Sequence, residues 1–162
     1  MKDPKSKIKT LPQINSIRKL ARKQGKTVVF TNGVFDLLHR GHVDYLQRAR
    51  ALGDVLILGL NTDASTRQIK GFMRPLIPQK DRAAVLSALE CVDYIVLFNE
   101  NTPEQLIARL LPDVLVKGAD YKEKDIVGAE AVKAHGGKAV RMKFLKGYST
   151  TGLIRTILSR YR

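Results

Sequence analysis

Two histidines flank an Arg-Gly pair in His39-Arg40-Gly41-His42, directly after an apolar segment and before a helical pattern. A glycine allows the backbone to approach a ligand closely, and the free N–H groups at a helix start favour phosphate. Two imidazoles can donate hydrogen bonds to oxygens whose negative charge grows during group transfer. The segment therefore predicts a site that binds a phosphate chain.

Two other interpretations of the histidine pair remain open at this point. A spacing of three residues would suit zinc, but a third ligand is not evident, since Cys91 is remote and His135 lies in an ordinary Gly-rich turn. The pair could also be surface histidines on a strand-to-helix turn. The P-loop and G-x-G-x-x-G patterns are absent, which argues against a Walker NTPase and a standard dinucleotide site.

Short β-branched segments alternate with helical patterns, which predicts an α/β fold with a five-stranded parallel sheet. We expect strands at residues 27–31, 54–60, 93–98, 113–117 and 138–142. Their apolar character is nearly continuous, so helices should cover both faces in a Rossmann-like three-layer sandwich. Ligands of such sheets bind beyond the carboxyl ends of the strands, which is where the polar motifs stand.

Local signals predict the connections between the strands. Thr102 and Pro103 form a start signal, with a capping hydroxyl, for a helix that reaches about residue 111. A last helix is expected at about 150–160, and glycine and prolines predict a loop at 67–80. We divide the chain into a basic, helical N-terminal extension (1–24) and one catalytic domain (25–162).

Four segments, in order, are similar to one known family. Residues 33–42 resemble the G-x-F-D…H-x-G-H signature of the cytidylyltransferase-like nucleotidyltransferase superfamily, whose histidines contact a triphosphate. The Asn-Thr-Asp of 61–63, the Val-Lys-Gly-Ala-Asp-Tyr of 116–121 and the Gly-Tyr-Ser-Thr-Thr of 147–151 are similar to its further motifs. The likeness is greatest to its adenylyltransferases that act on D-glycero-D-manno-heptose 1-phosphate.

That resemblance implies a reaction in which a sugar 1-phosphate oxygen attacks the α-phosphorus of ATP. The products are ADP-heptose, for bacterial surface polysaccharide, and pyrophosphate, with Mg²⁺ accompanying the triphosphate. CTP as donor, or another phosphorylated acceptor, remains an alternative. Relatives acting on glycerol phosphate or choline phosphate have Arg-Thr-Glu where residues 144–146 read Phe-Leu-Lys.

The resemblance also implies roles for individual residues, and it implies no metal ligands from the protein. The catalytic residues would be His39, His42 and Lys117. Contacts to the nucleotide are expected from Asn32, Gly33, Phe35, Gly41, Gly118, Tyr148, Ser149 and Thr150. Contacts to the substrate are expected from Asp36, Asn61, Asp63, Lys70, Arg74 and Asp120.

The net charge of +14 lies at the two ends of the chain. Residues 1–26 hold nine Lys/Arg against one Asp, and no acidic residue follows Glu130. A nucleic-acid-binding module would explain this charge, but no zinc finger, RRM signature or basic-region heptad accompanies it. A field that attracts polyanionic small molecules explains it equally well.

The absence of a long apolar run and of a secretory apolar stretch predicts a cytoplasmic protein without membrane contact. Its partners should be small-molecule substrates, with a homodimer or higher homo-oligomer as an open alternative.

Overall fold

A computed structural model describes residues 3–118 and 126–161 of the chain. Asp120, expected to contact substrate, lies outside the described residues. The helices are a 3₁₀ turn Pro4–Lys7, α1 Leu11–Lys23, α2 Arg40–Arg50, α3 Asp63–Lys70, α4 Gln79–Ser87, α5 Glu104–Leu110, α6 Ala129–Ala134 and α7 Thr150–Arg160. The strands are β1 Ile8–Lys9, β2 Val28–Gly33, β3 Val55–Asn61, β4 Tyr94–Phe98, β5 Val114–Gly118 and β6 Lys138–Met142.

The strands form one parallel sheet in the order β1-β4-β3-β2-β5-β6. The parallel sheet is confirmed, and the five expected strands lie within two residues of their predicted bounds. The prediction of five strands was wrong, because the described residues form six. The additional strand, β1, pairs Ile8 with Ile95 and Lys9 with Val96. Two residues in a lysine-rich segment carry no apolar alternation from which a strand could be predicted.

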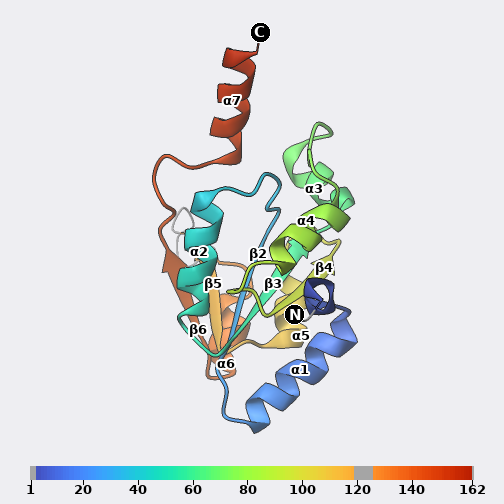
Figure 1. Ribbon diagram of the computed structural model, residues 1–162. Coiled ribbons are helices and arrows are strands. Elements are labelled where there is room, and N and C mark those ends of the chain that lie inside the picture. The colour runs from blue at the N-terminus through green and yellow to red at the C-terminus, as the bar shows by residue number, and fades with distance from the viewer. Residues whose placement is uncertain (1–2, 119–125, 162) are drawn as a thin grey trace.

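Alternate side chains of the central strands enter two separate cores, which makes the molecule a three-layer sandwich (Figure 1). Val29 packs with Leu46 of α2 and Leu86 of α4 on one face. Phe30, the next residue of β2, packs with Ile107 of α5 on the other face, which α1 and α6 also cover. Both faces are buried because each strand residue points opposite to its neighbour.

The order in which strands are added to the sheet changes direction beside β2, and this switch point positions the site. From β2 the chain adds β3 and then β4 on one side, whereas β5 and β6 lie on the other side. The loops leaving β2 and β5 therefore separate at their carboxyl ends and leave a crevice between them. Asn32 stands at the end of β2 and Lys117 at the end of β5.

Two local predictions need correction. The loop expected at 67–80 starts later, because α3 continues to Lys70 and ends at Gly71, whose φ of 90° leaves the helical region. The helix expected from Thr102 begins at Glu104 behind Pro103, without a side-chain capping bond. Pro103 occupies the N-cap position of that helix, so the Thr102 hydroxyl does not cap it.

The two basic ends of the chain differ in how they pack. Helix α1 buries Ile14 and Ala21 in the core it shares with α5 and α6, although the division into extension and domain stays a prediction. Helix α7 lies as expected but buries no residue and projects from the body at the carboxyl edge of the sheet (Figure 1). No helix in residues 3–118 or 126–161 is long and apolar enough to cross a membrane.

Candidate active site

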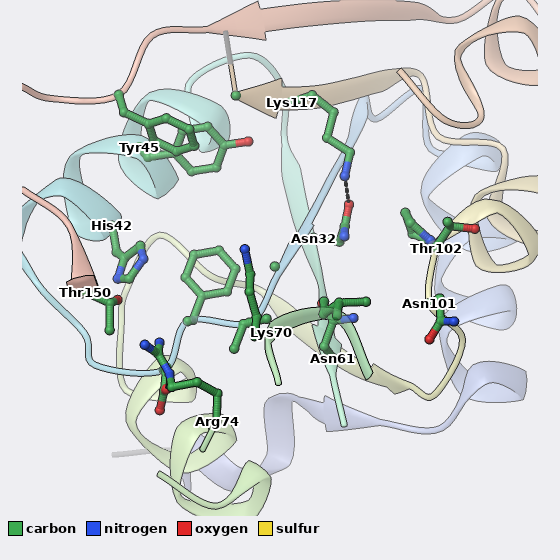
Figure 2. Close-up of a pocket in the computed structure, with 18 of the residues that line it drawn as sticks. Asn32, His42, Tyr45, Asn61, Lys70, Arg74, Asn101, Thr102, Lys117 and Thr150 are labelled. Atoms are coloured by element: carbon green, nitrogen blue, oxygen red, sulfur yellow. Dashed lines mark hydrogen bonds and ion pairs between the residues drawn. The ribbon is translucent and has the colours of Figure 1, made fainter. Parts of the chain in front are cut away.

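A cavity of about 500 Å³ opens beyond the carboxyl ends of the strands, where the strand order changes direction (Figure 2). The ends of β2, β3 and β5 line it together with the segments that follow them. At its base the Lys117 ammonium donates to Asn32 Oδ1, so β2 and β5 are joined across their crevice. The volume of the cavity lies in the range of small-molecule sites, roughly 300–1,000 Å³.

The chain between β2 and α2 brings the two histidines into contact. Phe35 adopts a left-handed backbone with φ of 47°, which is costly for a residue with a large side chain and turns the chain sharply after the strand. His39 then caps α2, where its Nδ1 accepts from the His42 backbone N at 3.3 Å. The two rings stack with centroids 3.7 Å apart and planes within 14°.

Gly41 makes this close stacking possible. A Cβ at position 41 would lie 2.9 Å from Tyr148 Cβ, which is too close for real side chains, and 3.1 Å from His39 Nδ1, which would push the His39 ring away. Tyr148 therefore lies directly over the turn, and its ring stacks loosely on His39 at 6.5 Å. The segment before α7 and the start of α2 thus meet at the histidine pair.

Burial disfavours the charged form of both imidazoles. The pKa of His42 is lowered to about 4, mainly by burial and also by repulsion from His39, while the Leu37 backbone acts in the opposite direction. Burial also lowers the pKa of His39. The buried Nδ1 of His42 has no hydrogen-bond partner among the described residues, which is a costly state for a polar atom.

Asp36 anchors the loop that carries Arg74 and follows Lys70, the last residue of α3. Its side chain is 1% exposed and accepts from Arg74 Nε at 2.6 Å. The backbone N–H groups of Leu76 and Ile77 also donate to it, both at 2.9 Å. Both carboxylate oxygens are therefore engaged by the loop, and the predicted contact of Asp36 with substrate stays a prediction.

Arg82, a buried residue that was not predicted from the sequence, joins several segments around the cavity by hydrogen bonds. Arg82 of α4 has a fully buried side chain and donates to the carbonyls of Val34, Asn61 and Ile77 at 2.6–2.9 Å. It also pairs with Asp63 at 2.8 Å. In the folded chain, residues 82, 83, 86 and 87 all lie on the buried face of α4. A charged residue on that face requires partners.

The structure brings most of the predicted site residues to one cavity. Those that line it are Asn32, Gly33, Phe35, Asp36, His42, Asn61, Lys70, Arg74, Lys117, Gly118 and Thr150. His39 and Gly41 adjoin it through the stacked turn, and Ser149 caps α7 by accepting from Gly152 N at 3.0 Å. Asp63 does not line it and is instead held by Arg82 and Gln79. Asn101 and Thr102 line the cavity but were not predicted as site residues.

The sequence of residues 30–156 matches the family described as Cytidylyltransferase-like. The chain belongs to this family and is a nucleotidyltransferase, which confirms the resemblance found in the motifs.

Curated relatives share more than half of their aligned residues with this chain. "Bifunctional protein HldE" of Syntrophotalea carbinolica is 53% identical over 156 residues, which is 96% of this chain. The protein of the same name from Citrifermentans bemidjiense is 54% identical over 99% of this chain. The chain spans about a third of the length of these relatives, 32% and 33%.

Two solved structures have a similar fold. The lipopolysaccharide core biosynthesis protein from Thermoplasma volcanium superposes with a TM-score of 0.65 at 30% identity, covering 75% of this chain and all of the other. The pantoate-beta-alanine ligase of Francisella tularensis, solved with an ATP analogue and beta-alanine, gives 0.60 at 16% identity, covering 94% of this chain and 79% of that one. The second likeness concerns the fold alone.

Proposed function

We propose that this chain transfers the adenylyl group of ATP to D-glycero-D-manno-heptose 1-phosphate and releases pyrophosphate. The observation that carries the proposal is the stacked His39–His42 pair at the start of α2, beside a cavity that Lys70, Arg74 and Lys117 also line. The similarity to the HldE proteins and to the lipopolysaccharide core biosynthesis protein supports the choice of acceptor.

The cavity suits a reaction between two anions. Lys70, Arg74 and Lys117 reach it from three different segments, so positive charge offsets the repulsion between the phosphates of donor and acceptor. An acceptor phosphate oxygen is already ionised at neutral pH, so a strong base is not required. Its bond to the α-phosphorus forms while the bond from that phosphorus to the bridging oxygen breaks, and pyrophosphate leaves with the electron pair.

The histidines would act as hydrogen-bond donors to the triphosphate. A neutral imidazole carries one N–H, and a ring turned toward the cavity can direct it at a phosphate oxygen. The free N–H groups at the start of α2 lie in the same turn and favour the same anion. Thr150 lines the cavity at the start of α7, so Ser149 and Thr150 are the proposed contacts from the chain's last segment.

Mg²⁺ is proposed only as a companion of the nucleotide. Within the described ranges no group of three or more His, Cys, Asp or Glu side chains could hold a metal ion. Asp36 and Asp63 are engaged by arginine and by backbone or side-chain amides. These residues do not form a cage for the ion, so no step of the mechanism is assigned to it.

Pyrophosphate release measured with ATP or CTP against heptose 1-phosphate or glycerol 3-phosphate tests the proposal. We expect ATP with heptose 1-phosphate to give the highest kcat/KM. Replacing His42 with alanine should lower turnover by more than about 10²-fold without unfolding the protein, as when one transition-state donor is lost.

The exposed His135, which follows the last residue of α6, provides the control, and His135→Ala should keep the wild-type rate. Near-normal turnover of His42→Ala would remove this residue from the mechanism. A preference for CTP or for glycerol 3-phosphate would refute the proposed donor or acceptor.

A further inference from the structure

The cavity has two sides of different chemistry (Figure 2). His42, Thr150 and Arg74 lie on one side, and Lys70 extends toward it from the end of α3. Asn61, Asn101 and Thr102 lie on the other side, where the Lys117 ammonium donates to Asn32 Oδ1. The side chains of Asn61, Asn101 and Thr102 are polar but uncharged, so they suit a part of the substrate other than its phosphates.

At the corner formed by Asn61, Asn101 and Thr102, two hydrogen bonds fix the Asn61 side chain and the backbone just before Asn101. Asn61 Nδ2 donates to Ser65 Oγ at 2.8 Å, and Ser65 Oγ donates to the carbonyl of Glu100 at 2.9 Å. The end of β3 is thereby joined to the segment that leads into Asn101. A corner fixed in this way loses little conformational entropy when a ligand binds, which is typical of a binding site.

The side chains of this corner keep polar atoms available to a ligand. In the part of the chain that the structure describes, no hydrogen bond engages the side chains of Asn101 or Thr102 or the Oδ1 of Asn61. The Thr102 hydroxyl is not used to cap α5, although its sequence position favours that role. Amides and hydroxyls both donate and accept, which matches the hydroxyl groups of a sugar.

We infer that Asn61, Asn101 and Thr102 select the acceptor by hydrogen bonding to hydroxyl groups of its sugar, while the cations opposite hold its phosphate. This inference rests on the proposed function. Pro103, Ile126 and Val127 line the same cavity and offer apolar surface to the C–H faces of a sugar ring. A site built to bond substrate hydroxyls discriminates strongly against an acceptor that lacks them.

The test compares Asn101→Ala and the double variant Asn101→Ala/Thr102→Val with wild type. The matched control is Gln105→Ala, an exposed amide of α5 outside the cavity. Each lost hydrogen bond should raise KM for heptose 1-phosphate by up to about tenfold, while KM for ATP stays within about twofold. The preference for heptose 1-phosphate over glycerol 3-phosphate, as a ratio of kcat/KM values, should fall by a similar factor.

Binding of heptose 1-phosphate measured by calorimetry requires no turnover, so it separates this inference from the proposed function. If wild type binds heptose 1-phosphate about tenfold or more tightly than the double variant, the inferred role of the corner is supported. This holds even where transfer to that acceptor is absent. An unchanged Kd in the double variant overturns the inference. A rise in KM for ATP alone also overturns it, since the corner would then hold the nucleotide.

Discussion

Arg82 offers the sharpest test of how the cavity is built. Its buried guanidinium joins four acceptors from the segments that follow β2, β3 and the loop before α4. We expect Arg82→Met, which preserves much of the side chain's volume, to loosen all of these segments together. The variant leaves three carbonyls without this donor and Asp63 without its cation.

The magnitude follows from the burial. The Arg82 side chain is fully buried, whereas that of Asp63 is 25% exposed, so water relieves only part of the loss. Removing one partner of a buried ion pair costs about 3–5 kcal/mol, against a total unfolding free energy of roughly 5–15 kcal/mol. For a chain of this size that corresponds to a fall in Tm of roughly 6–20 °C.

Thermal and urea unfolding of the purified variant measure this loss. Arg67→Met removes an exposed arginine from α3 and serves as the control, with an expected change below about 0.5 kcal/mol. The loss of stability in Arg82→Lys should lie between those of Arg82→Met and Arg67→Met, because a single ammonium cannot reach all the acceptors arranged around a planar guanidinium. A Tm of Arg82→Met within 2 °C of wild type, a threshold of about 1 kcal/mol, would refute the role given to this network.

Two further predictions concern the histidine turn and its loop. The NMR titration of the His42 ring in the ligand-free protein should show a midpoint at about 4, because burial disfavours the charged form. The unfolded chain then binds more protons between pH 6.5 and 4, so wild type should lose more stability on acidification through this window than His42→Gln does. A midpoint near 6.5 would contradict the burial argument. Asp36→Asn should raise KM for the acceptor, because Arg74 and the N–H groups of Leu76 and Ile77 lose a charged acceptor. Unchanged kinetics with wild-type Tm would show that Asp36 does not anchor the loop.

Features set by short-range pattern could be predicted from the sequence. Nearly continuous apolar segments identify the buried strands β3, β4 and β5 and the first half of β2, which lie where that pattern indicates. The edge strand β6 also lies at its predicted residues, although its Lys138 and Arg141 are exposed. The His-x-Gly-His turn was predicted as a site because its spacing and its position before a helix are local properties. The short strand β1 carries no such pattern, since its pairing depends on where β4 lies.

Features that depend on distant partners could not be predicted in this way. Arg82 is a functional candidate only once Val34, Asn61 and Ile77 surround it, and these carbonyls come from separate segments. The same holds for Thr102, whose sequence neighbours favour a helix cap although the folded chain places it beside the cavity. Local preference decides the role of a polar side chain only where tertiary contacts do not compete with it.

The stacking of His39 on His42 limits how much charge the site can carry before the nucleotide arrives. Two imidazolium rings with centroids 3.7 Å apart would repel each other. At an effective dielectric constant of about 20, two unit charges about 4 Å apart interact with roughly 4 kcal/mol. Burial adds a desolvation cost for each charge, which is why both rings have lowered pKa values. A triphosphate would reverse this balance, because its negative charge stabilises a proton on the ring nearest to it. In the proposed function, burial and stacking would therefore favour uncharged rings before the nucleotide arrives, and the bound triphosphate would favour a proton on one of them.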